Sequence, residues 1–139
     1  MQVNTYLAFS GDCKAAFETY EKVLGGKIAF IMTNGESPMA NQTPPDWKDK
    51  IMHVTLQVPG GGVLQGADHP KGKKVTPAGF SVCVALQDAA EAERIFKGLS
   101  DGGQVQMEFQ KTFWSPGFGM CIDKFSVPWM VNTEEPMGN

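Results

Sequence analysis

Hydrophobic and polar positions along the first half of the chain predict one helix set among strands. Residues 2–9 are typical of a strand, and the segment from residue 13 has apolar side chains at helical spacing. Asp12 is a suitable N-cap for this helix, and the pair Gly25 and Gly26 predicts its end. Strands are expected at 27–33, 51–58 and 62–67, with a long proline-rich loop between the first two. The predicted order is β-α-β-β-β.

The same order begins again at residue 79. A strand is predicted at 79–86 and a helix, with Asp88 as its N-cap, at 89–103. Strands follow at 104–110, 119–125 and 128–134. Asp12 matches Asp88 and Tyr20 matches Phe96, both at an offset of 76 positions. The pattern therefore predicts one domain, residues 1–139, built from a duplicated unit of about 70 residues. Its copies cover about 1–70 and 77–135, and neither should be stable alone.

The charge and hydropathy of the chain exclude nucleic acids and membranes as expected partners. The chain has 139 residues, with 12 Lys and Arg against 15 Asp and Glu, and a net charge of −3. It lacks the clustered cations that nucleic acids or anionic membranes require, and no segment is long and apolar enough to span a bilayer. Three cysteines form no CxxC pair. We therefore expect a reduced, cytoplasmic protein that binds neither nucleic acid nor membrane.

Several segments resemble one known family. Residues 6–28, the NGESPM loop and above all the segment FWSPGFGMCIDKFSVPWMVN are similar to the PhnB-like branch of the vicinal oxygen chelate superfamily, also called the glyoxalase/bleomycin resistance/dioxygenase superfamily. The resemblance implies an α+β fold of two βαβββ modules with curled sheets, helices on the convex side, a concave ligand cavity and a homodimer. Relatives often carry a ubiquinone-methyltransferase label. That activity is not expected here, because the chain has no glycine-rich strand-to-helix turn followed by an acidic residue.

The metal site of the superfamily is expected to be absent. Its four ligand positions fall on Thr5, Gln65, Ser81 and Met130, of which only Gln65 is a plausible ligand. A divalent metal needs about three or four well-placed donors, and a hydroxyl or thioether is a poor substitute for imidazole or carboxylate. The sequence therefore predicts no metal and no cofactor.

His53 is the best candidate for chemistry. Its strand alternates so that Val54 and Leu56 should face the helix and His53 the cavity, where it would be the only side chain with a pKa near neutrality. A purely structural histidine is the alternative. The same alternation, with Trp114 as an aromatic wall and Glu36 on a loop that could fold over the cavity, predicts a lining made of Thr5, Leu7, Phe9, His53, Gln65, Ser81, Cys83, Trp114, Met130 and Glu36.

Two functional hypotheses follow, beside a third class, a scaffold whose only role is dimerisation and whose cavity would be closed. The first is a protein that binds a small, partly apolar molecule in a cavity without metal. The second is an enzyme, either a metal-dependent lyase, isomerase or dioxygenase of the superfamily type, or a metal-free catalyst that uses His53 for acid-base chemistry. Whether residues 35–48 form a lid is left open.

Overall fold

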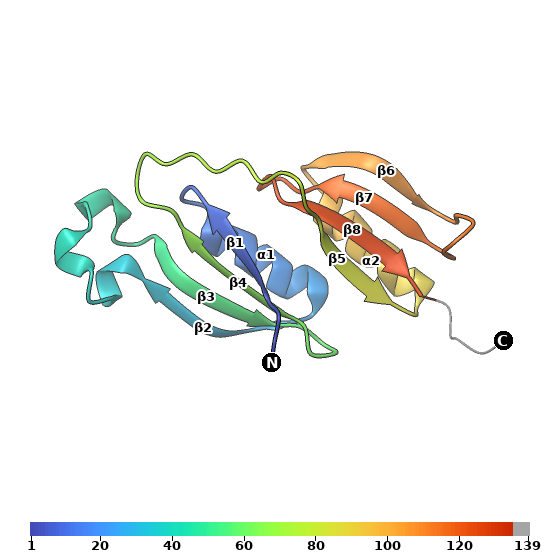
Figure 1. The fold of residues 1–139 in the computed structure, drawn as a ribbon, viewed down its shortest axis with the longest axis horizontal. Coiled ribbons are helices and arrows are strands. Elements are labelled where there is room, and N and C mark those ends of the chain that lie inside the picture. The colour runs from blue at the N-terminus through green and yellow to red at the C-terminus, as the bar shows by residue number, and fades with distance from the viewer. Residues whose placement is uncertain (135–139) are drawn as a thin grey trace. The chain divides into compact units, whose positions relative to one another are not determined.

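The computed structural model describes residues 1–134 and divides the chain into two compact units, the first covering Met1–Val75 and the second beginning at Thr76. Each unit is one four-stranded mixed sheet with one helix against it (Figure 1). The predicted α+β fold of two βαβββ modules is confirmed. Neither sheet closes on itself into a barrel.

The first unit contains one helix and four strands: β1 (Thr5–Phe9), α1 (Cys13–Leu24), β2 (Lys27–Thr33), β3 (Ile51–Gln57) and β4 (Val63–Asp68). The strand order is β1-β4-β3-β2, in which β1 runs parallel to β4 and the other neighbours are antiparallel. Parallel pairing of β1 with β4 needs a long crossover, which α1, β2 and β3 supply.

The second unit repeats this arrangement with the strand order β5-β8-β7-β6. Its strand β5 runs parallel to β8. The elements are β5 (Val82–Leu86), α2 (Ala89–Ser100), β6 (Gln104–Gln110), β7 (Phe118–Ile122) and β8 (Pro128–Thr133). Each expected strand and helix is present, with its ends at the expected residues or shifted by up to three.

The proline-rich segment between β2 and β3 folds into three short 3-10 helices, η1 (Asn34–Glu36), η2 (Ala40–Gln42) and η3 (Pro45–Trp47). The indole Nε1–H of Trp47 donates a hydrogen bond to the carbonyl of His69, at 3.0 Å. The Trp47 ring also lies against Gly11, where an added Cβ would be 3.1 Å from its Cη2 atom. This segment is therefore fastened to the loops that follow β1 and β4, at one end of this parallel pair.

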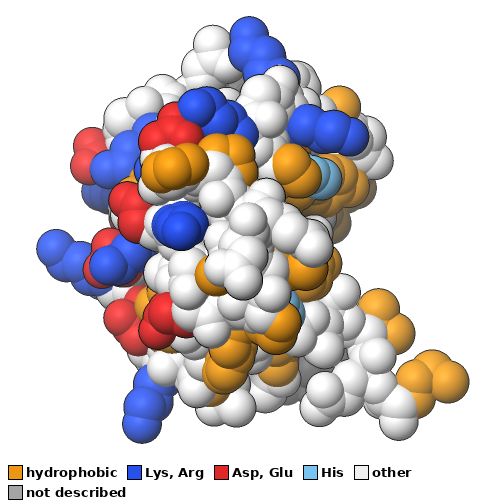
Figure 2. Space-filling view, turned by 90° about the vertical axis from the view of Figure 1, so that its left-hand side faces the viewer, with side chains coloured by type: hydrophobic (Ala, Val, Ile, Leu, Met, Phe, Trp, Pro, Cys, Tyr) orange, Lys and Arg blue, Asp and Glu red, His pale blue; other side chains and the backbone are white. Residues whose placement is uncertain are grey.

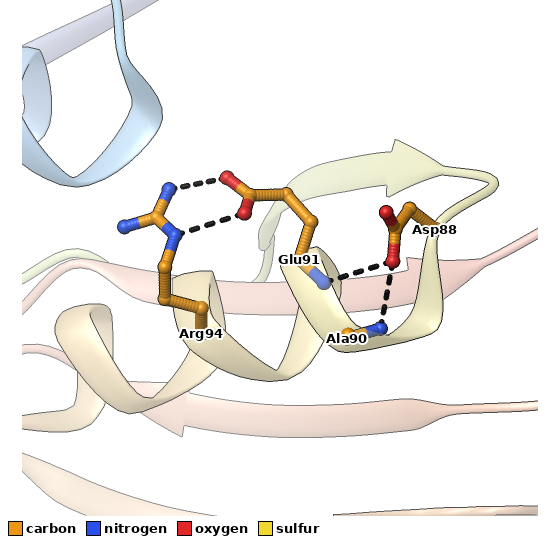
Figure 3. Close-up of polar contacts among 4 residues, drawn as sticks. All are labelled: Asp88, Ala90, Glu91 and Arg94. Atoms are coloured by element: carbon orange, nitrogen blue, oxygen red, sulfur yellow. Dashed lines mark hydrogen bonds and ion pairs between the residues drawn. The ribbon is translucent and has the colours of Figure 1, made fainter.

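The two helices begin in different ways. Asp88 caps α2 as predicted, because its carboxylate accepts the N–H groups of Ala90 and Glu91 at 2.9 and 3.1 Å (Figure 3). The expectation that Asp12 does the same for α1 is wrong, since its side chain makes no capping hydrogen bond.

In the first unit, the start of α1 is capped by Asp68, which lies at the end of β4. One oxygen of its carboxylate accepts the N–H groups of Gly11 and Cys13, at 2.7 and 3.1 Å. The other accepts the N–H of Ile51, at 2.8 Å. The side chain is buried, so these three charge-assisted hydrogen bonds tie β4 to the start of α1 and to the start of β3.

Replacing Asp68 by Asn should destabilise the protein by about 2 kcal/mol, because an amide has a single acceptor oxygen and leaves a buried N–H without a partner. Urea unfolding followed by circular dichroism measures this. Asp46→Asn is the matched control, since the Asp46 carboxylate is exposed and pairs only with Lys71. Equal unfolding midpoints for the two variants would contradict the role assigned to Asp68.

Candidate ligand-binding faces

In the first unit, α1 covers the face of the sheet that carries Leu7 and Phe9. Leu7 is the register partner of Gly66, so the two project to the same side. A Cβ on Gly66 would lie 2.6 Å from the ring of Phe17 on α1, and the Phe9 ring packs edge-on against Phe17 with centroids 6.0 Å apart. Leu7 and Phe9 are each 2% exposed. The expectation that they face an open cavity is wrong, because they belong to the core.

The expectation failed because the connection from strand to helix is one residue longer in the first unit than in the second. Three residues separate Phe9 from the start of α1, whereas two separate Leu86 from the start of α2. Aligning the strands from the helix caps therefore shifts β1 by one position, and a shift of one exchanges the faces of a strand. Thr5 shares the side of Leu7, and the open face carries Tyr6 and Ala8 instead.

The open face of the first sheet has a polar row with an aromatic border. Gln65 is the register partner of Tyr6 on one side and of Thr55 on the other, and Thr55 is in turn paired with Phe30. His53 lies two positions along β3 from Thr55 and therefore on the same face, as the sequence predicts. Tyr6 and Phe30 are 54% and 46% exposed, so this face is accessible within the unit.

His53 is held between two rings and two hydroxyl groups. Its ring centroid lies 5.7 Å from that of Tyr6 and 5.9 Å from that of Phe30. The Tyr6 hydroxyl is 3.3 Å from Nδ1, and the Thr55 hydroxyl is 3.0 Å from Nε2. Figure 2 shows histidine atoms among hydrophobic side chains on the face it presents.

The hydroxyl groups of Tyr6 and Thr55 limit which nitrogen of the His53 imidazole can carry its proton. Burial, with a smaller contribution from Cys13, raises the pKa of Tyr6 above its ordinary value, so the phenol is protonated at neutral pH. When it donates to Nδ1 of a neutral imidazole, the proton of that imidazole is on Nε2 and is donated to Thr55. Each ring nitrogen of His53 therefore lies within hydrogen-bonding distance of one hydroxyl group.

In the second unit, the open face has sulfur-containing and aromatic side chains. Cys83 is exposed and is the register partner of Met130, which is partly exposed. Trp114 is 52% exposed and packs edge-on against Phe118, with centroids 5.4 Å apart. Phe118 is the partner of Asn132, two positions from Met130 on the same face. Ser81 precedes β5 and is partly exposed.

The carboxylate of Glu36 has a local structural role. It accepts hydrogen bonds from the N–H and hydroxyl of Thr33, at 3.0 and 2.8 Å, in a capping box that begins η1. These hydrogen bonds lower the pKa of Glu36. Its contacts therefore stabilise the turn after β2.

The residues at the superfamily metal positions do not suit a hard divalent ion. In the first unit, Thr5 shares the helix side of Leu7, so the neighbour of Gln65 on the open face is the phenol of Tyr6. In the second unit, the neighbour of Met130 is Cys83 and not Ser81. Within residues 1–134, no three His, Cys, Asp or Glu side chains gather as a metal-binding group. An amide, a neutral phenol and a thioether do not replace imidazoles and carboxylates.

The architecture is that of the glyoxalase-like proteins. A glyoxylase/bleomycin resistance protein/dioxygenase domain from Frankia sp. EAN1pec superposes with a TM-score of 0.68 over 97% of this chain and 98% of that one, at 11% sequence identity. At this identity the likeness shows the fold alone. Within the described residues, no helix is long and apolar enough to cross a membrane.

Sequence comparison assigns the chain to a family. Residues 1–132 match the family model described as 3-demethylubiquinone-9 3-methyltransferase, and the chain belongs to this family. It is 32% identical to Protein YjdN of Escherichia coli over 142 residues, 95% of either chain. The crystal structure of protein PA1353 from Pseudomonas aeruginosa is 43% identical over 98% of this chain and 99% of that one, with a TM-score of 0.87. The resemblance to the PhnB-like branch of the glyoxalase/bleomycin resistance superfamily is thus confirmed.

Tyr6 and Phe30 are the residues of the His53 site that the sequence did not reveal. The available signal was the parity of β1, because Leu7 and Phe9 are its most apolar residues and a strand with one covered face turns such residues toward its helix. Phe30 follows an irregularity in the register of β2, which simple alternation does not predict.

Cys83 should be the one thiol that reacts rapidly in the folded protein. Cys13 and Cys121 are fully buried, and burial together with Asp123 raises the pKa of Cys121 to about 11. Titration with a chromogenic disulfide should count one fast thiol before unfolding and three in denaturant. Its rate should rise with pH, because partial burial and Glu134 raise the pKa of Cys83. Three equally fast thiols would contradict the burial of Cys13 and Cys121.

Proposed function

We propose that this protein binds a small, partly aromatic or apolar molecule on the open faces of its sheets without a metal ion. The observation that supports this most is the environment of His53, which has a ring on either side and a hydroxyl group at each nitrogen. Flat apolar walls beside a few fixed polar groups are the usual composition of a small-molecule site.

The polar row on the same face would orient the ligand. Gln65 stands between Tyr6 and Thr55 and carries both a donor and an acceptor. Because the hydroxyl groups of Tyr6 and Thr55 are directed to His53, the amide of Gln65 is the group most available for a ligand. A planar molecule with a carbonyl, amide or hydroxyl edge would match this arrangement.

The open face of the second unit supports the same ligand class. Trp114, which packs on the buried ring of Phe118, offers aromatic surface, and Phe113 beside it is 96% exposed. The side-chain oxygen Oδ1 of Asn132 is buried and has no hydrogen-bond partner within the described residues. A buried acceptor without a partner costs free energy, so a ligand N–H or O–H donated to Asn132 would be favourable.

Acid-base catalysis by His53 is the second candidate function. The chain of hydrogen bonds from Tyr6 through His53 to Thr55 would let the imidazole exchange a proton with a bound molecule. Methyl transfer, the activity in the family's description, is not proposed. The connections from β1 to α1 and from β5 to α2 lack the glycine-rich turn that binds the phosphates or nucleotide of a cofactor.

Binding can be tested by thermal shift across a library of planar aromatic acids, amides and phenols, followed by calorimetry of the hits. Gln65→Ala should weaken a hit about tenfold through loss of an orienting hydrogen bond, and Phe30→Ala by a similar factor through loss of an aromatic wall. Glu91→Gln, which alters an exposed ion pair on α2, is the control and should bind like the original protein. The proposal fails if no library member binds, or if hits bind all three variants equally.

The catalytic alternative predicts a different result for His53→Gln. If the imidazole transfers a proton, this variant should abolish turnover of a bound substrate while its affinity changes by less than about tenfold. Binding lost together with turnover would indicate that His53 only holds the ligand.

Two further expectations complete the proposal: a homodimer, which the resemblance implies, and a cytoplasmic location, which the cysteine pattern indicates. Light scattering of the purified chain should give about twice the 15.1 kDa chain mass if the dimer forms. A mass of one chain at micromolar concentration would remove the dimer from the proposal.

A further inference from the structure

One row of the second sheet consists entirely of sulfur-containing side chains. Cys83 on β5 is the register partner of Met130 on β8, Met130 is that of Met120 on β7, and Met120 is that of Met107 on β6. The row crosses all four strands. Register partners project to the same face of a sheet, so Cys83, Met130 and Met120 line up side by side. Met107, which lies between two register irregularities of β6, extends the row.

This row lies on the face that α2 leaves open. Gly119 and Cys121, the neighbours of Met120, belong to the helix side: a Cβ on Gly119 would lie 2.7 Å from the ring of Phe96 on α2, and Cys121 is fully buried. Met120 therefore projects the other way, together with its partners. The three methionines are partly exposed and Cys83 is exposed, so within this unit the row can meet solvent.

The spacing suits a shared ligand. The Cβ atoms of directly opposed residues are about 4.5–5.5 Å apart, and the unbranched methionine side chain has three rotatable bonds. Neighbouring sulfur atoms can therefore turn toward one ion. The carboxylate of Glu134 adds negative potential at Cys83, which favours a cation there.

We propose that three neighbouring residues of this row, Cys83, Met130 and Met120, bind one soft monovalent cation, Cu(I) or Ag(I), through their sulfur atoms. Thiolate and thioether ligands select Cu(I), whereas hard ions and most divalent ions prefer oxygen or imidazole. The thiol of Cys83 loses its proton to the buffer as the metal–sulfur bond forms. The thioethers bind as neutral donors, and the metal keeps its oxidation state. The site goes beyond the proposed function, which involves no metal.

The test uses the full chain, reduced and free of oxygen. Native mass spectrometry with Ag(I) should show one bound ion, and competition with a chromophoric chelator gives the affinity for Cu(I). The double variant Met120→Leu, Met130→Leu keeps apolar side chains of similar volume and should lose about tenfold or more in Cu(I) affinity. Met39→Leu, an exposed methionine outside the row, is the matched control and should bind like the original chain.

Two results would overturn the proposal: no bound ion at micromolar Cu(I) or Ag(I), or equal affinities for the double variant and the control. The second would mean that Cys83 binds metal as an isolated thiol. If the double variant does not fold, as judged by circular dichroism, Met130→Leu and Cys83→Ser provide the same comparison one ligand at a time. An independent readout is the alkylation of Cys83 by iodoacetamide, which one equivalent of Ag(I) should slow in the original chain and in Met39→Leu.

Discussion

The packing of one aromatic ring on one glycine determines what the first unit can do. Phe17 of α1 occupies the space where a Cβ of Gly66 would stand, which brings the helix onto that side of the sheet. Because side chains alternate along every strand, this contact assigns each residue of β1, β3 and β4 to the core or to the open face. His53, Gln65 and Tyr6 are accessible because Phe17 lies on the other side. In the second unit, Phe96 and Gly119 have the same relation, and the open face there carries Cys83 and Met130.

Two buried carboxylates hold the ends of the elements in these positions. Asp68 accepts backbone N–H groups at the start of α1 and of β3, and Asp123 accepts those of Phe125 and Val127 together with the indole N–H of Trp129. In each unit, one carboxylate thus satisfies donors that the secondary structure leaves without partners. The polar groups on the open faces take no part in these contacts.

The order of elements was predictable from the sequence because hydrophobic spacing, caps and glycines agree along both halves. The duplicated pattern also predicted two similar units, and alternation along β3 placed His53 on the open face correctly. The face of β1 was not predictable from the repeat, since the connection to α1 is one residue longer than its counterpart. The position of the Phe30 ring on the open face was not predictable either, because it depends on an irregularity in β2. The same holds for the start of α1, where Cys13 is capped by the carboxylate of Asp68, 55 positions away. These features depend on tertiary contacts that local patterns do not contain.

The placement of His53 between Tyr6 and Phe30, on the face of the first sheet opposite α1, is the feature on which the candidate site depends. Nuclear Overhauser spectroscopy of the aromatic side chains tests this placement, because it reports which rings lie close together in solution. We expect cross-peaks from the His53 ring to the rings of Tyr6 and Phe30, and none to Phe17. Cross-peaks between His53 and Phe17 would instead place the imidazole on the helix side of the sheet.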